Sequence, residues 1–230
     1  MNQWRRVAAG LLLFGISFGY VEAAVVVYLR TIYDPIRRQI DPARPSGDLF
    51  PLITPEQIRT AAPGISRLLV VEVFREAATI VMLAAVALVI AGGLKFWLPA
   101  FAVAFGAWDL FFYVFLKILI DWPASVYTWD ILFLIPVPWA APVLAPSVVS
   151  LTIMAAGLAA LRRPVCMRAA HWILVFGGCG LILFSFMQDF PNILAGGFPR
   201  PFDWPVFIAG ELAGAAGFLH ALRTSTLGKS

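Results

Sequence analysis

The sequence is poor in charge, cysteine and histidine, and each scarcity excludes a class of protein. Only 13% of the residues are charged and 61% are hydrophobic, whereas a soluble globular domain carries about a quarter charged residues. The two cysteines, Cys166 and Cys179, are too few for a disulfide framework. The spacing of a zinc site, a phosphate-binding loop, a dinucleotide fingerprint or a nucleophile elbow does not occur. A soluble domain and the common metal, nucleotide and hydrolase sites are therefore not predicted.

The chain has instead several apolar runs that approach or exceed the ~20 residues a helix needs to cross a bilayer. We therefore predict an all-α, polytopic membrane protein with a single transmembrane domain over residues 1–230. The first run is too long for the apolar part of a signal peptide, so we expect it to be a retained helix. The six predicted spans are Val7–Leu29, Arg67–Gly92, Phe96–Ile120, Ile131–Leu161, Ala169–Met187 and Trp204–Leu222.

Prolines break the fourth span. Three of them lie between Pro136 and Pro142, where a continuous helix would lose several backbone hydrogen bonds. We expect a short half-helix capped by Asp130, a break over residues 136–142, and a helix from Val143 onward. A discontinuous helix of this kind either lines a binding site or is a kinked helix without a ligand.

The basic residues predict that both termini are cytoplasmic, because short cytoplasmic loops favour Lys and Arg. The eight residues on which this orientation rests are Arg5, Arg6, Lys95, Arg162, Arg163, Arg168, Arg223 and Lys229. The loop of residues 30–66 is predicted to face outward although it is also rich in arginine. Its many prolines favour a lid over the outer mouth or a passive cap, and the sequence leaves both open.

On this topology all thirteen acidic residues can be placed on the outer side of the membrane. Five of them, namely Glu22, Glu72, Glu76, Asp109 and Glu211, fall inside apolar spans. A charge at mid-bilayer costs about 2.5–3.5 kcal/mol on insertion scales. We therefore expect these side chains to face each other, water or a bound ion rather than lipid.

Helical spacing groups the polar residues of the second and third spans. Glu72, Arg75 and Glu76 lie on one face of the second span, together with Thr79.

Asp109, Tyr113 and Lys117 follow each other at intervals of four residues in the third span. We expect Arg75 and Lys117 to act as counter-charges and the surplus carboxyls to hold protons or bind a cation. The alternative is a buried ion-pair network that only fixes how the helices pack.

A repeated pattern links the first, third and fifth spans. A Phe-Gly pair begins at Phe18, Phe105 and Phe176, and a basic or amide residue follows each Phe after twelve residues. The pattern predicts three tandem helical hairpins whose equivalent residues converge. A chance recurrence of common residues is the alternative.

The two histidines lie near the cytoplasmic ends of adjacent spans. His171 and His220 could ligate a haem between the helices, but their positions at helix ends favour a place at the membrane interface. The sequence leaves any cofactor unknown.

Three stretches resemble an uncharacterised group of bacterial multi-pass inner-membrane proteins. They are residues 19–24 (GYVEAA), 74–79 (FREAAT) and 129–139 (WDILFLIPVPW). The resemblance implies a place in the bacterial inner membrane and implies no activity.

The leading functional hypothesis is a proton- or cation-linked carrier of a small polar solute, with an acidic site that opens outward. The alternatives are an intramembrane enzyme on a lipid-linked substrate, or a non-catalytic subunit of a larger membrane complex. Expected partners are the bilayer, the solute or ion and a further copy or subunit, but no nucleic acid. No catalytic residue is assigned, and the predicted binding residues are Glu22, Glu72, Arg75, Glu76, Asp109, Tyr113, Lys117 and Glu211.

Overall fold

The chain folds into a mostly helical bundle. The structure, a computed structural model, describes residues 2–40, 42, 56–57, 60, 64 and 66–227. Six of its helices are long and apolar enough to cross a membrane, as predicted. The elements are α1 (Gln3–Ile40), α3 (Ser66–Ala91), η1 (Leu94–Phe96), α4 (Trp97–Ile120), β1 (Trp129–Phe133), β2 (Trp139–Pro142), α5 (Leu144–Arg162), α6 (Ala169–Met187), α7 (Phe190–Leu194) and α8 (Trp204–Leu227).

Local sequence signals set the ends of several helices. α3 ends before Gly92 and Gly93, which have φ angles of 68° and 142° that side chains rarely tolerate. α4 ends at Asp121, which adopts the left-handed conformation with φ 53°. The second and third predicted spans are therefore confirmed to within one residue, and the fifth matches α6 at both ends.

The first helix is longer than predicted. We expected it to end at Leu29, but α1 continues to Ile40 with Pro35 inside it. A proline inside a helix costs about 3 kcal/mol. Two ion pairs within the extension offset part of this cost, because Asp34 contacts Arg37 at 2.8 Å and Arg38 at 2.9 Å. Most of the predicted loop of residues 30–66, including its role as a lid, lies outside the described residues.

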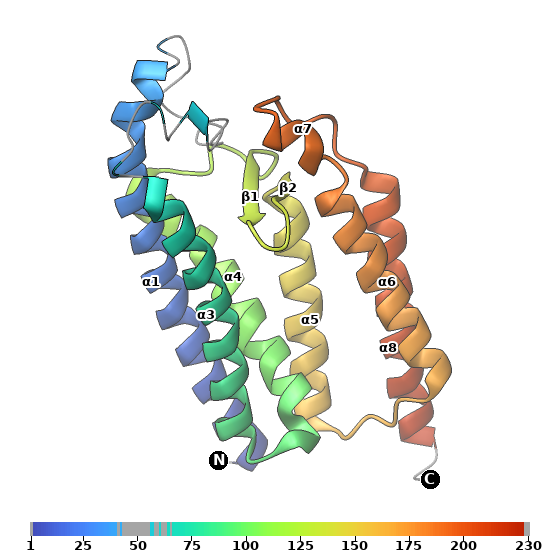
Figure 1. The fold of residues 1–230 in the computed structure, drawn as a ribbon. Coiled ribbons are helices and arrows are strands. Elements are labelled where there is room, and N and C mark those ends of the chain that lie inside the picture. The colour runs from blue at the N-terminus through green and yellow to red at the C-terminus, as the bar shows by residue number, and fades with distance from the viewer. Residues whose placement is uncertain are drawn as a thin grey trace.

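The helices form two groups (Figure 1). α1, α3, α4 and α5 pack together, with α4 at the centre, while α6 and α8 pack mainly on each other. α1 begins and α8 ends at the same end of the bundle, which we call the terminal end. The β-hairpin and α7 lie at the opposite end, which we call the hairpin end.

The first part of the fourth predicted span is not helical. The expected half-helix after Asp130 is replaced by strand β1, which pairs antiparallel with β2 and has an irregular register between Ile131 and Phe133. The hairpin turn points toward the interior of the bundle (Figure 1). Pairing of the two strands satisfies backbone groups that a proline-broken helix would leave without partners. The expected helix after Val143 is confirmed as α5.

The outer surface of the helices is apolar, as a lipid environment requires. Phe74, Val89 and Ile173 are 72%, 79% and 71% exposed. A soluble protein rarely exposes so much contiguous apolar surface. The largest buried cluster lies between α1, α3, α4 and α5 and includes Leu11, Leu83 and Trp108.

Glycines allow the closest helix contacts. A Cβ at Gly19 of α1 would lie 2.8 Å from the backbone oxygen of Trp108 in α4. A Cβ at Gly106 of α4 would lie 2.5 Å from the backbone oxygen of Ser150 in α5. Gly177, the third glycine of the repeated Phe-Gly pattern, has nothing within 4 Å of its Cβ position. The repeated glycines therefore occupy equivalent close contacts in two of the three cases.

The contrast between Gly19 and Gly177 gives a matched test of the fold. We expect Gly19→Ala to force α1 from α4 and lower the free energy of unfolding by about 1–3 kcal/mol. Gly177→Ala should be neutral or stabilise by up to ~1 kcal/mol, because alanine is the better helix former. Denaturant titration of the detergent-solubilised protein, followed by circular dichroism, measures both. Equal effects of the two substitutions would contradict the α1–α4 packing.

Candidate functional site

Arg75 of α3 holds two carboxylates. Its Nε donates to Glu72 Oε2 at 2.9 Å and its Nη2 to Glu72 Oε1 at 2.5 Å, which makes a two-pronged pair within α3. Its Nη1 donates to Glu22 Oε2 of α1 at 2.5 Å and to Thr79 Oγ1 at 3.3 Å. The spacing of Glu72, Arg75 and Thr79 along one helical face brings them together as predicted. Arg75 therefore links α1 to α3 through charge.

Glu76 turns from the same helix toward the hairpin. Its Oε2 accepts a hydrogen bond of 2.9 Å from the backbone N–H of Leu134, which lies in the hairpin turn. The side chain is buried, and the charges of Glu72, Arg75 and Glu22 all act on it. The carboxylate thus supplies the acceptor that this part of the irregular backbone needs.

Asp109 connects α4 to α5. Its Oδ2 accepts a hydrogen bond of 2.8 Å from the hydroxyl of Ser150, which is almost fully buried. The charge of Glu22 also acts on Asp109. Asp109 is therefore electrostatically coupled to the residues around Arg75.

Asp130 of β1 is the fifth carboxyl of this region. Its Oδ2 accepts a hydrogen bond of 3.0 Å from the hydroxyl of Tyr113 on α4. Burial raises the pKa of Asp130 to about 7 and the charge of Asp109 adds to this, whereas Tyr113 and Arg30 oppose it. Asp130 can therefore gain or lose a proton near neutral pH.

These contacts define what we call the carboxylate network. Its acids are Glu22, Glu72, Glu76, Asp109 and Asp130, and the cations that act on them are Arg75 and Arg30. If all five carboxyls were ionised, the two guanidinium groups would leave a net surplus of three negative charges (5 − 2 = 3) among the described residues of the network. In an apolar environment such a surplus favours bound protons or a bound cation.

Two predicted site residues lie outside the network. Lys117 points to the end of α4, where it contacts Asp121 Oδ1 at 2.7 Å and donates to the backbone oxygen of Pro123 at 3.1 Å. The hydrogen bond from Lys117 lowers the pKa of Asp121. The structure therefore places Lys117 beside Asp121 at the helix end and not beside a carboxyl of the network.

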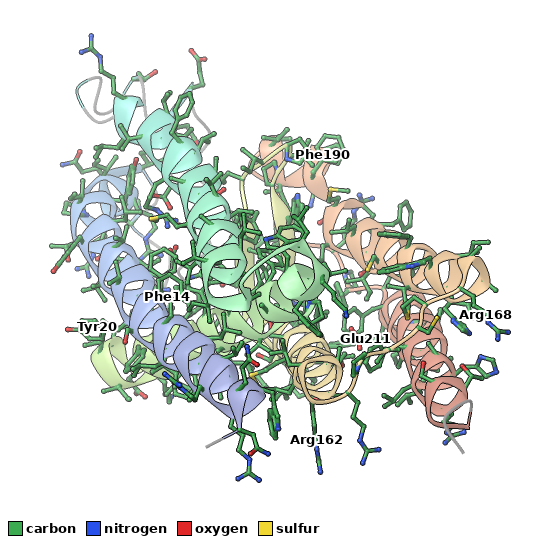
Figure 2. All side chains as sticks on the ribbon, turned by 90° about the horizontal axis from the view of Figure 1, so that it is seen from below. Phe14, Tyr20, Arg162, Arg168, Phe190 and Glu211 are labelled. Atoms are coloured by element: carbon green, nitrogen blue, oxygen red, sulfur yellow. The ribbon has the colours of Figure 1, made fainter. Side chains whose placement is uncertain are left out.

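Glu211 belongs to a separate contact. Its Oε2 accepts a hydrogen bond of 2.9 Å from the hydroxyl of Thr152, which joins α8 to α5. Figure 2, seen from the terminal end, shows Glu211 between these two helices. The structure thus divides the predicted site into the carboxylate network and this smaller pair.

Sequence reasoning missed several partners. Asp130 was expected to cap a helix, and Ser150 drew no prediction. Ser150 lies between Ser147 and Thr152 in the same run, so its sequence context does not distinguish it from these neighbours. The backbone N–H of Leu134 carries no signal in the sequence, because its role arises only from the hairpin.

Four buried N–H groups have no hydrogen-bond partner among the described residues. They belong to Arg30, Trp108, Trp122 and Trp139. Buried indole and guanidinium donors are normally satisfied by protein, water or ligand. These donors therefore mark places where a further acceptor is needed.

The two histidines meet at the terminal end. The backbone N–H of Arg168 donates to His171 Nδ1 at 3.1 Å, and His171 Nε2 lies 2.9 Å from His220 Nδ1. Because a backbone N–H can only donate, His171 Nδ1 must accept, so neutral His171 donates from Nε2 to His220. The rings join α6 directly to α8. Within the described residues no three His, Cys, Asp or Glu side chains are placed to hold a metal ion together.

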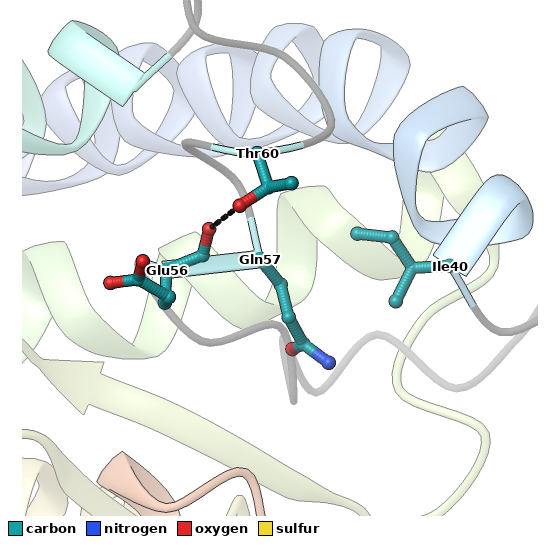
Figure 3. Close-up of a pocket in the computed structure, with 4 residues that line it drawn as sticks. All are labelled: Ile40, Glu56, Gln57 and Thr60. Carbon is teal, nitrogen blue, oxygen red and sulfur yellow. Dashed lines mark hydrogen bonds between the residues drawn. The ribbon is translucent and has the colours of Figure 1, made fainter.

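A shallow pocket lies beyond the network, at the end of α1. It has a volume of about 270 Å³ and is lined by Ile40, Glu56, Gln57 and Thr60 (Figure 3). None of these residues belongs to the carboxylate network. Because the pocket borders the segment outside the described residues, we assign no site to it.

No protein-family model matches the chain, and comparisons with curated proteins and with solved structures find no match. The class of the protein therefore rests on its own features. By helix length and hydropathy it is a multi-pass membrane protein. The resemblance to bacterial inner-membrane proteins stays a prediction.

The ion pairs of Arg75 predict a large effect of its removal. Arg75→Gln leaves Glu22 and Glu72 without a cation, and we expect a loss of about 3–5 kcal/mol of stability, as for other broken buried pairs. The double variant with Glu22→Gln should recover part of this loss. Denaturant titration of the detergent-solubilised protein measures both.

Arg38→Gln is the matched control, because Arg38 is 63% exposed and pairs with Asp34 at the surface. Loss of such a pair costs about 0–1 kcal/mol. If Arg75→Gln were as mild as Arg38→Gln, the network would not hold α1 to α3.

Proposed function

We propose that this chain is a proton- or cation-linked carrier of a small polar solute, and that the carboxylate network is its coupling site. The observation that carries the proposal is the surplus of carboxyls. Within the part of the chain that the structure describes, five acids from α1, α3, α4 and β1 interact with each other and with only two guanidinium groups. Intramembrane acids of this kind mark proton relays and ion paths by default.

The two kinds of partner in the network suggest how the coupling works. Arg75 pairs with Glu22 and Glu72 and fixes their positions, so we assign these two acids a supporting role in the site. Glu76, Asp109 and Asp130 are held by neutral donors, namely a backbone N–H, a serine hydroxyl and a tyrosine hydroxyl. These three carboxyls are the ones that take up protons or coordinate a cation.

Glu76 connects the bound proton to the position of the hairpin. A hydrogen bond to an ionised carboxylate is roughly twice as strong as one between neutral groups. Protonation of Glu76 therefore weakens its contact with Leu134 in the hairpin turn. The hairpin then acts as a gate at this end of the bundle, and its opening depends on the charge of Glu76.

The proposal predicts protonated carboxyl groups that specific substitutions remove. In infrared spectra of the reconstituted protein, we expect a carbonyl band of protonated carboxyls that is lost as the pH rises from about 5 to about 9. Glu76→Gln and Asp109→Asn should each reduce the band. Asp121→Asn should leave it unchanged, because Asp121 is 90% exposed and lies outside the network.

The functional readout is proton movement into liposomes that contain the protein and a trapped pH-sensitive dye. Solutes are added one at a time, and at least one is expected to drive proton entry that Glu76→Gln and Asp109→Asn abolish. Carboxyls that are ionised over the whole pH range would refute the proton-binding site. A changed lipid headgroup in a deletion strain without proton movement would favour the intramembrane enzyme instead.

The bacterial inner membrane, with both termini in the cytoplasm, is the proposed location. The resemblance described above supports the membrane. The charge distribution supports the orientation, because basic residues occur at both ends of the bundle but the described acids all lie away from the terminal end, which is therefore net positive. Figure 2 shows Arg162 and Arg168 projecting outward at this end. The basic residues described at the terminal end are Arg5, Arg6, Lys95, Arg162, Arg163, Arg168 and Arg223.

Thiol labelling tests this orientation. Cys166 is exposed between α5 and α6, so a membrane-impermeant maleimide should fail to label it in intact spheroplasts. Ala124→Cys, at an exposed position between α4 and β1, should be labelled in a Cys166→Ser, Cys179→Ser background. The reverse pattern would place both termini outside.

A further inference from the structure

Arg30 of α1 has a buried donor that no described residue satisfies. Its guanidinium carbon lies 4.5 Å from the centre of the Trp122 ring, over the ring face. Its Nη1 is buried and has no hydrogen-bond partner among the described residues. Stacking on an aromatic face uses the flat side of a guanidinium group and leaves the N–H groups at its edge free to bind an acceptor.

Trp122 offers a second unused donor in the same stack. The residue is 4% exposed, and its Nε1 is buried without a partner among the described residues. The Nε1 of Trp97, by contrast, donates to the backbone oxygen of Ala84 at 2.9 Å, whereas Trp108 and Trp139 resemble Trp122 in having no partner among the described residues. Arg30 and Trp122 therefore share a need for an acceptor that the described protein atoms do not meet.

Asp130 is the nearby carboxylate, but it is engaged elsewhere. It accepts the hydrogen bond of Tyr113, whose ring centre lies 6.2 Å from that of Trp122. Arg30 acts on Asp130 through space rather than through a hydrogen bond. The stack thus combines a positive charge and two buried donors with a carboxylate that does not occupy them.

We propose that Arg30 and Trp122 form a binding site for an anionic oxygen group, a carboxylate or a phosphate, on the solute that the protein carries. The proposal rests on the carrier function proposed above and names the class of its solute. A planar guanidinium edge matches the two oxygens of a carboxylate or phosphate. The indole N–H adds a neutral donor, and neither donor suits a cationic solute.

The position of Asp130 couples this site to protons. A negative charge on Asp130 repels a bound anion, so loss of that charge strengthens anion binding. The groups that face Asp130 are Arg30 from α1 and Tyr113 and Asp109 from α4. Because the pKa of Asp130 is about 7, anion binding should strengthen as the pH falls through neutrality. A proton and an anion would then bind together, as a symporter requires.

The test uses the full chain in detergent, with acetate, succinate and inorganic phosphate as probes. Isothermal titration at about pH 6 and about pH 8 should show saturable binding of at least one probe, tighter at the lower pH. Arg30→Gln should weaken it by about tenfold to a hundredfold, as for lost charge-assisted hydrogen bonds. Trp122→Phe keeps an aromatic ring but removes the N–H, and should weaken binding about two- to tenfold.

Matched control variants show whether a loss of anion binding is specific to the Arg30–Trp122 site. Arg38→Gln removes a surface arginine of the same helix, and Trp97→Phe removes an indole N–H that already has an acceptor. Both should bind the probes as the unchanged protein does. Asp130→Asn should retain binding and lose its dependence on pH. Circular dichroism confirms that each variant is folded.

A lipid headgroup is the other source of the same chemistry. If the anion belongs to lipid, nanodiscs that contain phosphatidylglycerol should suppress probe binding, and nanodiscs of phosphatidylcholine alone should not. That result keeps the anion site and assigns it to a lipid rather than to a soluble solute. The proposal is overturned if no probe binds, or if folded Arg30→Gln binds as well as the unchanged protein.

The failure of this proposal can be told from failure of the carrier function. Absent anion binding with an intact infrared band of protonated carboxyls would remove the Arg30 site alone. The opposite result would remove the proton-linked function alone. In that case the chain binds the anion, no such infrared band is seen, and binding at both pH values is unchanged in Glu76→Gln, Asp109→Asn and Asp130→Asn.

Discussion

The ion pair between Arg75 and Glu22 is the contact on which the acidic region depends. α1 and α3 pack mainly on α4 rather than on each other, so their rotation relative to one another is weakly fixed by apolar packing. A single guanidinium that binds Glu22 across the gap and Glu72 on its own helix sets that rotation. Because Glu76 is the next residue, the same rotation directs it to the hairpin turn. The ion pair therefore positions the group that meets the irregular backbone.

The β-hairpin needs acceptors for its backbone, and the buried acids need donors for their carboxyl groups. Non-helical backbone within a membrane bundle survives only where protein or water satisfies its polar groups. Strand pairing satisfies many of them, but the turn at Leu134 needs an acceptor from outside the hairpin, and Glu76 supplies it. Asp130 makes the second polar link, to Tyr113. Two carboxyls that would be costly among lipid chains thus become the links that seat a proline-rich segment inside the bundle.

The sequence predicted features that are set within a single helix, but it did not predict contacts between two helices. Hydropathy and helix-breaking residues located the six spans, and helical spacing placed Glu72, Arg75 and Thr79 on one face. Spacing cannot tell which neighbouring helix that face meets, so the partnership of Arg75 with Glu22 was not predicted.

The same limit explains the hairpin and Lys117. An Asp before an apolar run is typical of a helix start, but Pro136 and Pro138 lie in a turn that returns the chain as a second strand. Asp130 is consequently part of a strand instead of a cap. Lys117 continues the stripe of Asp109 and Tyr113 by spacing, but its long side chain reaches the helix end and pairs with Asp121. The length of the lysine side chain explains this pairing, because it lets the ammonium group extend from an apolar span to the polar surface.

The strengths of the polar contacts differ within and between the two groups of helices. Within the first group, Arg75 makes ion pairs of 2.5 Å with two carboxylates. α5 meets the second group through the hydroxyl of Thr152 and the carboxyl of Glu211. Two residues earlier in α5, Ser150 binds Asp109 on the other side of the helix. A hydroxyl can donate to a carboxyl in either protonation state, so such links break and form again at little cost. The proposed carrier function requires that α6 and α8 can move against the rest of the bundle, and a hydroxyl link such as Thr152–Glu211 permits such movement more readily than an ion pair like that of Arg75.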